Sequence, residues 1–186
     1  MSLDDLFLEG EEKMEKAVNQ LKKAFSAIRT GRANPLVLDK VVVDYYGAPT
    51  PLRQMSQVQV QDGTTLVISP FDKSIIKDIE KALIKAELGV NPNSDGMVIR
   101  MTFPPLTEER RKESVKEVKK LGEEAKVAIR NIRRDMTDDL KKLEKEENLP
   151  EDVVKDNQNE IQKLTDNYTK NIDTAVAEKE KEVLTV

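Results

Sequence analysis

From Thr107 to Glu147 the chain reads TEERRKESVKEVKKLGEEAKVAIRNIRRDMTDDLKKLEKEE, without an internal proline. Small or apolar residues recur along this stretch in steps of three and four, at Val115, Val118, Gly122, Ala125, Ile129, Ile132 and Met136. The heptad spacing predicts a long helix with one narrow apolar seam, rather than a broad stripe facing a core. At a rise of roughly 1.5 Å per residue, this helix would be about 60 Å long. A rod with a single seam needs partner helices.

Two further stretches provide such partners. Residues 2–29 predict a first helix, with Ser2 as its N-cap and a seam at Phe7, Met14, Val18, Leu21, Phe25 and Ile28. It should stop near Gly31. A third helix begins at Glu151 after the Asn148–Pro150 break, with near-heptad spacing of Val154, Ile161, Leu164, Tyr168, Ile172, Ala175 and Val183. The short break makes the last two helices antiparallel neighbours, and three seams can close a bundle.

Between the first two helices the pattern changes to strands and turns. Residues 37–46 are rich in β-branched and aromatic side chains and predict a strand, followed by a turn over 47–51. Residues 58–61 and 64–69 predict a hairpin around Asp62-Gly63, and 97–103 a last strand. A short amphipathic helix starting at Asp72 or Ser74 should end at Gly89.

The fold predicted from these elements is α+β: an elongated three-helix bundle with an inserted small β/α/β domain. The bundle would comprise residues 1–30 and 106–186, and the insert residues 31–105. Two connections join them, and both contain residues that restrict or break regular structure. We therefore expect a two-stranded hinge whose residues are Gly31, Pro35, Pro104 and Pro105.

The composition removes much of the catalytic repertoire. Histidine and cysteine are absent, which excludes a thiol nucleophile, an imidazole base, a disulfide and a Cys/His zinc site. No phosphate-binding glycine loop or dinucleotide fingerprint is present. We expect no enzyme activity, no cofactor and no metal. No apolar run approaches the ~20 residues of a membrane span, and the N-terminus resembles no signal peptide. These features predict a cytoplasmic protein without membrane contact.

Charge is unevenly distributed along the chain. Residues 110–134 hold ten Lys/Arg and four Glu, whereas residues 135–186 hold eight Lys and fifteen Asp/Glu. A basic block beside an acidic one indicates a directed electrostatic surface. The alternative is that these charges only keep long helices solvated.

The arginines fall mostly into two groups. Arg130, Arg133 and Arg134 lie on the central helix, and Arg29, Arg32, Arg110 and Arg111 lie near the expected hinge. Arg130 projects beside Arg133 and Arg134, away from the Ile129/Ile132/Met136 seam. Guanidinium groups form bidentate bonds to phosphate. No aromatic residues lie between these arginines to stack on the bases of a single strand. The group therefore predicts contacts to the backbone of folded RNA. The alternative is internal pairing, such as Arg134 with Asp138.

Tyr45-Tyr46-Gly47, followed by Pro49 and Pro51, could form an exposed recognition turn. Tyrosines at a strand end are more often half-buried packing residues, and this interpretation is favoured here.

Six collinear segments resemble the ribosome recycling factor family. They are residues 44–52 (DYYGAPTPL), 89–96 (GVNPNSDG), 105–112 (PLTEERRK), 130–135 (RNIRRD), 28–32 (IRTGR) and 162–166 (QKLTD). The resemblance implies a three-helix bundle and a smaller domain arranged like an L. It implies binding to the large ribosomal subunit after termination, with Arg130 and Arg133, and less strongly Arg29 and Arg32, on ribosomal RNA. Elongation factor G, using GTP, would press on the smaller domain to separate the subunits, and initiation factor three would keep them apart.

Two hypotheses of different class follow. The first is a non-enzymatic, RNA-binding recycling factor, expected to work as a monomer because three internal helices make self-association unnecessary. The second is a coiled-coil adaptor or holdase that binds proteins through its seams. The first predicts salt-dependent binding to the large subunit that depends on Arg133. The second predicts little affinity for RNA and no effect of Arg133→Ala.

Overall fold

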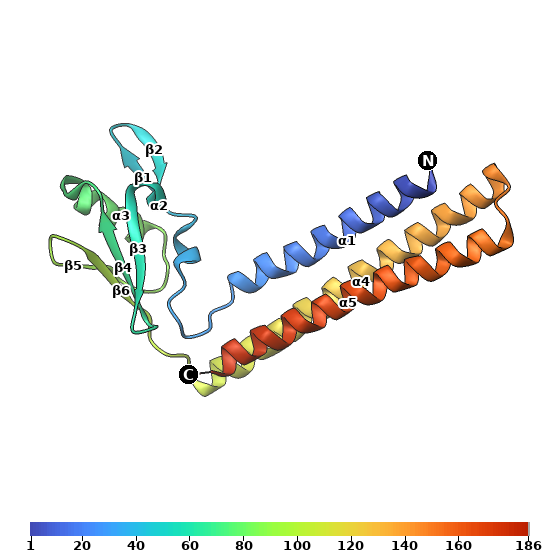
Figure 1. Ribbon diagram of the computed structural model, residues 1–186. Helices are drawn as coiled ribbons and strands as arrows, with labels where there is room; N and C mark the ends of the chain where they lie inside the picture. Colours follow the sequence, from blue (N-terminus) through green and yellow to red (C-terminus); the bar gives the residue numbers. More distant parts are fainter. Residues whose placement is uncertain (186) are drawn as a thin grey trace. The chain divides into compact units, whose positions relative to one another are not determined.

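The computed structural model describes residues 1–185, which divide into two compact units (Figure 1). One unit contains residues 1–28 and 109–185, and the other contains residues 29–108. The first unit is built of three long helices, and the second carries every strand of the described chain. The predicted α+β class, with a helical bundle and a small β-sheet domain, is confirmed.

The bundle consists of α1 (Leu3–Ser26), α4 (Glu108–Glu147) and α5 (Glu151–Leu184). Asn148 has a φ of 49°, a conformation that asparagine tolerates better than most residues, and it reverses the chain after α4. The Leu149 N–H then donates to the Glu144 carbonyl at 3.2 Å. As predicted, α4 and α5 run antiparallel, and α1 lies alongside them (Figure 1).

The seam predicted for α4 lies in the bundle core. Val118, Ala125, Ile129 and Met136 are buried, while Val115 and Ile132 pack partly buried against them. Leu140 and Leu143 extend the seam toward the end of the helix. On α5 two polar residues, Thr165 and Lys179, join the buried face, and the apolar pattern alone did not predict them.

The predicted seam of α1 omitted two buried positions at its start. Leu6 and Gly10 are buried with Met14, while Phe7 packs partly buried against the core, as predicted. The seam predicted for α1 consisted only of residues with apolar side chains and therefore left out Gly10. It lies directly against the Met136 side chain, where an added Cβ would overlap the thioether. The glycine is therefore a close-packing position of the bundle.

Both ends of α1 follow local hydrogen bonding. The Asp5 N–H donates to the Ser2 hydroxyl at 3.1 Å, and the Ser2 N–H donates to the Asp5 carboxylate at 3.0 Å. This capping box confirms Ser2 as the N-cap. The helix ends at Ser26, earlier than predicted, because the N–H groups of Ala27 and Ile28 bond three residues back and tighten the last turn.

The small unit contains a hairpin and a four-stranded antiparallel sheet. Strands β1 (Val42–Tyr45) and β2 (Ala48–Pro51) form the hairpin. The sheet has the order β3-β4-β6-β5, built from β3 (Ser56–Gln61), β4 (Thr65–Pro70), β5 (Asn93–Ser94) and β6 (Ile99–Thr102). The helices are η1 (Pro35–Leu38), α2 (Leu52–Met55), η2 (Lys73–Ile75) and α3 (Ile76–Lys85).

Three local predictions in this unit are wrong. The helix expected to end at Gly89 ends at Lys85. The strand predicted over 37–46 begins only at Val42, because residues 35–38 form the 3-10 helix η1, in which Asn34 accepts a hydrogen bond from Leu36 N–H and Pro35 fixes the first turn. The turn expected at 47–51 is strand β2, and only Tyr46-Gly47 turns the chain. Pro49 and Pro51 are tolerated there because β2 pairs with β1 alone and is an edge strand.

The core of the small unit lies between the sheet and α3. Leu66 and Ile68 of β4 and Ile99 of β6 are fully buried, as are Ile79 and Leu83 of α3. The two helical residues are four apart, so they present one apolar face to the sheet.

Both segments that enter and leave the small unit are fixed to the turn between β3 and β4. The Ala33 N–H donates to the Gly63 carbonyl at 2.9 Å, and the Phe103 N–H donates to the Thr64 carbonyl at 2.8 Å. Asp62 and Gly63 have φ values of 54° and 71°, which confirms the predicted hairpin turn. Each connecting segment is therefore hydrogen-bonded to the small unit at this turn.

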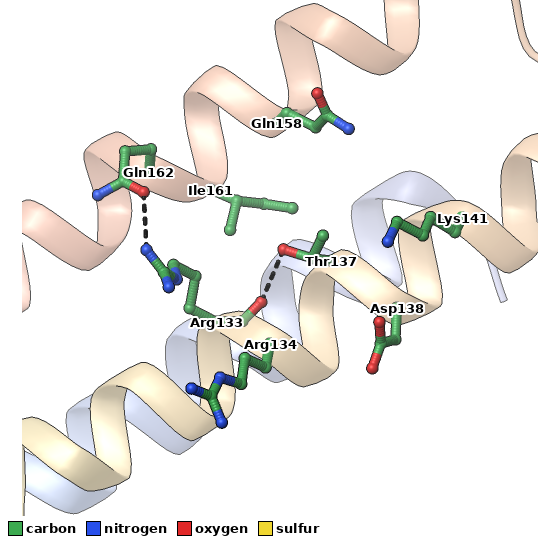
Figure 2. Close-up of a pocket in the computed structure, with 8 residues that line it drawn as sticks. All are labelled: Arg133, Arg134, Thr137, Asp138, Lys141, Gln158, Ile161 and Gln162. Atoms are coloured by element: carbon green, nitrogen blue, oxygen red, sulfur yellow. Dashed lines mark hydrogen bonds between the residues drawn. The ribbon is translucent and has the colours of Figure 1, made fainter.

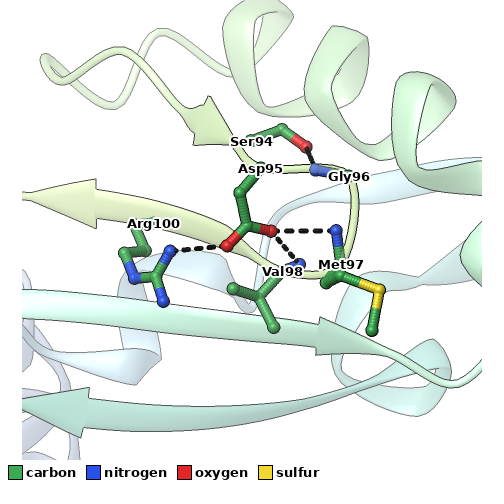
Figure 3. Close-up of polar contacts among 6 residues, drawn as sticks. All are labelled: Ser94, Asp95, Gly96, Met97, Val98 and Arg100. Carbon is green, nitrogen blue, oxygen red and sulfur yellow. Dashed lines mark hydrogen bonds and ion pairs between the residues drawn. The ribbon is translucent and has the colours of Figure 1, made fainter.

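A second turn, between β5 and β6, is organised by one carboxylate (Figure 3). Asp95 accepts from the N–H groups of Met97 and Val98, both at 2.9 Å, and its other oxygen accepts from Arg100 at 2.9 Å. Hydrogen bonds from the two backbone amides, with Arg100, lower the pKa of Asp95 to about 2.

Candidate nucleic-acid interface

Three arginines of α4 form the centre of the candidate interface. Arg130 and Arg134 are exposed and Arg133 is half-buried, while Ile129 and Met136 on the other side of the helix face the core. The packing of α4 therefore turns the three guanidinium groups away from the bundle core, as the spacing predicted.

Arg133 is held by a neighbouring helix. Its Nη1 donates to Oε1 of Gln162 on α5 at 3.2 Å, and Nε2 of Gln162 donates to the Asp166 carboxylate at 2.8 Å. Figure 2 shows the Arg133 side chain extending from α4 toward α5.

Beside this contact, α4 and α5 enclose an open groove of about 460 Å³. Three cationic side chains line it, Arg133, Arg134 and Lys141, against one carboxylate, Asp138. Thr137, Gln158 and Gln162 add polar groups, and Ile161 adds an apolar surface (Figure 2). Its excess of cations with hydrogen-bond donors suits an anionic backbone better than an apolar ligand.

Internal pairing does not occupy Arg134. Within the described residues it forms no ion pair, although Asp138 lies four positions further along the helix. Figure 2 shows the Arg134 side chain extending away from Asp138. The pairing considered from the sequence is absent, so this guanidinium remains available to a partner.

The arginines near the expected hinge have different surroundings. Arg29 Nη2 donates to the Pro104 carbonyl at 3.3 Å, and its Nε is buried without a hydrogen-bond partner in the described chain. Arg32 is exposed. Arg110 and Arg111 lie in the first turn of α4, the former exposed and the latter half-buried. Arg29 thus bridges the two connecting segments of the small unit, a contact that the sequence did not reveal.

The expected hinge residues lie in or beside these connecting segments. Gly31 has a φ of 81°, which glycine adopts without the strain of a side chain, and an added Cβ would lie 3.4 Å from Leu106 N. Pro104 and Pro105 are exposed, and Pro35 begins η1.

The two adjacent tyrosines of the hairpin have opposite environments. Tyr45 is half-buried against the small core, and its hydroxyl donates to Asp72 at 3.4 Å. Partial burial and the Asp72 carboxylate raise the pKa of Tyr45. Tyr46 is 83% exposed, and its ring stands T-shaped to that of Tyr45 with the centroids 4.6 Å apart. The packing interpretation is therefore confirmed for Tyr45 and wrong for Tyr46.

Other site types have little support in the described residues. Residues 1–185 hold no group of three or more acidic side chains placed to bind a metal ion. In the same range, no helix combines the length and the apolarity required to cross a bilayer.

Sequence reasoning missed Gln162, Asp166, Gln158 and Lys141 as neighbours of the arginines. Gln162 and Asp166 stand at i and i+4, which places them on one face of α5. That spacing could have indicated the bond between them. Their position opposite Arg133 depends on the register between α4 and α5, which a single sequence does not specify.

The chain is similar to known proteins along almost its full length. The sequence model of a family described as ribosome recycling factor matches residues 21–184. The ribosome-recycling factor of Bacillus velezensis is 53% identical over 183 residues, which cover 98% of this chain and 99% of the relative. That of Staphylococcus aureus (strain JH9) is 52% identical over 184 residues, covering 99% of this chain and 100% of the relative.

Solved structures agree with the sequence relatives. A solution structure of the ribosome recycling factor superimposes with a TM-score of 0.81 at 39% identity, covering 100% of this chain and 99% of that one. A second match has a TM-score of 0.68 at 44% identity and covers all of both chains. It is described as models for the T. thermophilus ribosome recycling factor and the E. coli elongation factor G bound to the E. coli post-termination complex.

Proposed function

The chain belongs to the ribosome recycling factor family, whose members are non-enzymatic translation factors, and we propose how its surfaces perform that function. It binds the post-termination ribosome together with elongation factor G, as its structural relative does. Our proposal is that the bundle attaches to ribosomal RNA of the large subunit through the arginines of α4. Elongation factor G, using GTP, then drives the subunits apart in the cytoplasm, and initiation factor three keeps them separate.

The observation that carries this proposal is the basic groove at Arg133 and Arg134. Its cations stand on α4, which packs in the bundle core, and they are not neutralised by direct ion pairs within the described chain. RNA backbones are recognised by guanidinium groups, since each can form two parallel bonds to one phosphate. Arg130 extends this surface along α4. Arg32, Arg110 and Arg111 are secondary candidates, and Arg29 is the least available because its Nε is buried and its Nη2 bonds to Pro104.

The connecting segments supply the proposed hinge. The anchors at Ala33 and Phe103 hold each segment to the small sheet, so rotation would fall outside them, at Gly31 on one side and Pro104-Pro105 on the other. Pro35 marks where the first segment becomes regular structure. Such a hinge would let elongation factor G move the small unit without unfolding the small unit or the bundle.

The test is co-sedimentation with purified large ribosomal subunits over a series of salt concentrations. Arg133→Ala should weaken binding about tenfold, because a charge-assisted hydrogen bond contributes roughly 1.5 kcal/mol or more. It should also reduce the slope of log affinity against log salt by about one. The control is Lys145→Ala, which removes one positive charge from an exposed position of the same helix outside the groove. Equal effects of the two variants would refute a specific contact.

A further inference from the structure

Arg133 is the one arginine of the α4 group with a hydrogen bond to another side chain in the described chain. Arg130 and Arg134 are exposed, and among residues 1–185 no side chain of another helix bonds to their guanidinium groups. An arginine side chain has several rotatable bonds, so a free one must lose that freedom when it binds a phosphate. Arg133 has already lost part of it.

The partner of Arg133 is itself fixed in orientation. A guanidinium can only donate hydrogen bonds and a carboxylate can only accept them. Gln162 stands between the two, so its amide oxygen must face Arg133 and its NH₂ group must face Asp166. Reversing the amide would break both bonds. The chain Asp166–Gln162–Arg133 therefore selects one orientation of the glutamine.

The intermediate amide has an electrostatic consequence. Within the described residues Arg133 makes no ion pair, and the Asp166 carboxylate is linked to it by hydrogen bonds only through the neutral glutamine. A direct carboxylate partner would orient the guanidinium equally well but would also compete with a phosphate for its positive charge. The glutamine orients the cation and leaves its charge available.

We propose that Gln162, oriented by Asp166, is a positioning residue that holds Arg133 in its RNA-binding conformation while leaving its charge unpaired. The inference rests on the function proposed above and adds a residue of α5 to a contact made by α4. Gln162 need not touch the RNA for this role.

The experiment measures affinity for purified large ribosomal subunits at several salt concentrations, for variants in the wild-type and Arg133→Ala backgrounds. Gln162→Ala should weaken binding about three- to tenfold, the cost of ordering one long side chain on binding. It should leave the salt slope unchanged, because Arg133 still reaches its phosphate. In the Arg133→Ala background the same change should have no further effect, which a double-mutant cycle measures.

Gln162→Glu is the second variant. It keeps an oxygen that accepts from Arg133 but places a negative charge directly on the guanidinium. It should therefore reduce the salt slope by about one, as Arg133→Ala does. Asn171→Ala is the matched control, because it removes an exposed amide from the other side of the same helix. It should leave affinity and slope unchanged.

The outcomes separate the two proposals. If Arg133→Ala weakens binding and Gln162→Ala does not, the positioning role is refuted and the Arg133 contact stands. If Gln162→Ala weakens binding equally in both backgrounds, it acts independently of Arg133, which also refutes the positioning role. If Arg133→Ala has no effect, the RNA contact itself fails and the positioning role with it. Melting temperatures of the variants verify that each one is folded.

Discussion

Two charged side chains, Asp95 and Arg133, have different roles in this chain. Both carboxylate oxygens of Asp95 accept hydrogen bonds within its own turn, from two backbone amides and from Arg100. Arg133 donates one hydrogen bond to the neutral amide of Gln162, and within the described residues its positive charge has no ion-pair partner. The first arrangement stabilises local structure, and the second is typical of a group that must meet a charged partner.

The Asp95 turn predicts a definite pH dependence. Its pKa of about 2 lies below the ordinary 3.8, so the folded chain binds this proton less readily than the unfolded chain. The stabilisation is therefore complete above about pH 4 and is lost as the pH falls through about 2. We expect Asp95→Asn to be less stable than wild type at neutral pH, and the difference in melting temperature to shrink between pH 4 and 2.

Thermal unfolding of both proteins across this range measures that difference. A direct check is the NMR titration of the Asp95 side-chain carboxyl carbon, whose midpoint should lie near 2. A midpoint near 4, or a difference in melting temperature that does not vary with pH, would contradict the role assigned to these hydrogen bonds.

At the scale of the elements, two glycines set how closely the helices of the bundle approach. A Cβ added at Gly122 of α4 would lie 2.5 Å from Cγ2 of Val176 on α5. Valine in a helix has essentially one χ1 rotamer, so it cannot move aside. At Gly10 of α1 the neighbour is the flexible end of Met136, which can adopt another rotamer.

This difference gives the second stability prediction. Gly122→Ala should destabilise the bundle by about 1–3 kcal/mol through overpacking, partly offset by the better helix propensity of alanine. Gly10→Ala should cost less than about 1 kcal/mol, because the gain in propensity and the flexibility of Met136 act together. Urea unfolding followed by circular dichroism measures both, and an equal cost at the two sites would contradict the assignment.

The long helices were the most predictable elements because each carries its own signals. The seam of α4 was correct from Val115 to Met136, and Ser2 was correctly placed as a cap, since both depend on residues three or four positions apart. The predicted seam of α1 omitted Leu6 and Gly10, and at Gly10 close packing replaces an apolar side chain. Whether such a position belongs to the seam depends on the side chain that faces it from the neighbouring helix.

The small unit was less predictable because its geometry depends on pairing. The two prolines of β2 indicate a turn when the sequence is read alone, but pairing with β1 makes them an edge strand. The candidate site was also only partly predictable, because it depends on how two elements pack. Its arginines were visible in the sequence, while Gln162 and Lys141 became neighbours only through the register of α5 against α4.

At the scale of the whole molecule, membership in the family decides between the two hypotheses raised by the sequence. The adaptor hypothesis explained the helical seams but required no particular role for the arginines of α4. In the structure the seams are used internally, in the core that α1, α4 and α5 share. The groove at Arg133 and Arg134 is lined mainly by cations and polar groups, and it suits the contact with ribosomal RNA proposed above.

The central claim is that Arg133 contributes to binding and that elongation factor G supplies the motive force. The most direct measurement follows the separation of post-termination ribosomes by light scattering, with this chain, elongation factor G and GTP. We expect splitting only when all three are present. Arg133→Ala should split slowly at low factor concentration and at the wild-type rate at saturating concentration, since the arginine acts in binding. Failure of the wild-type chain to split ribosomes, or a variant that matches it at every concentration, would contradict the account.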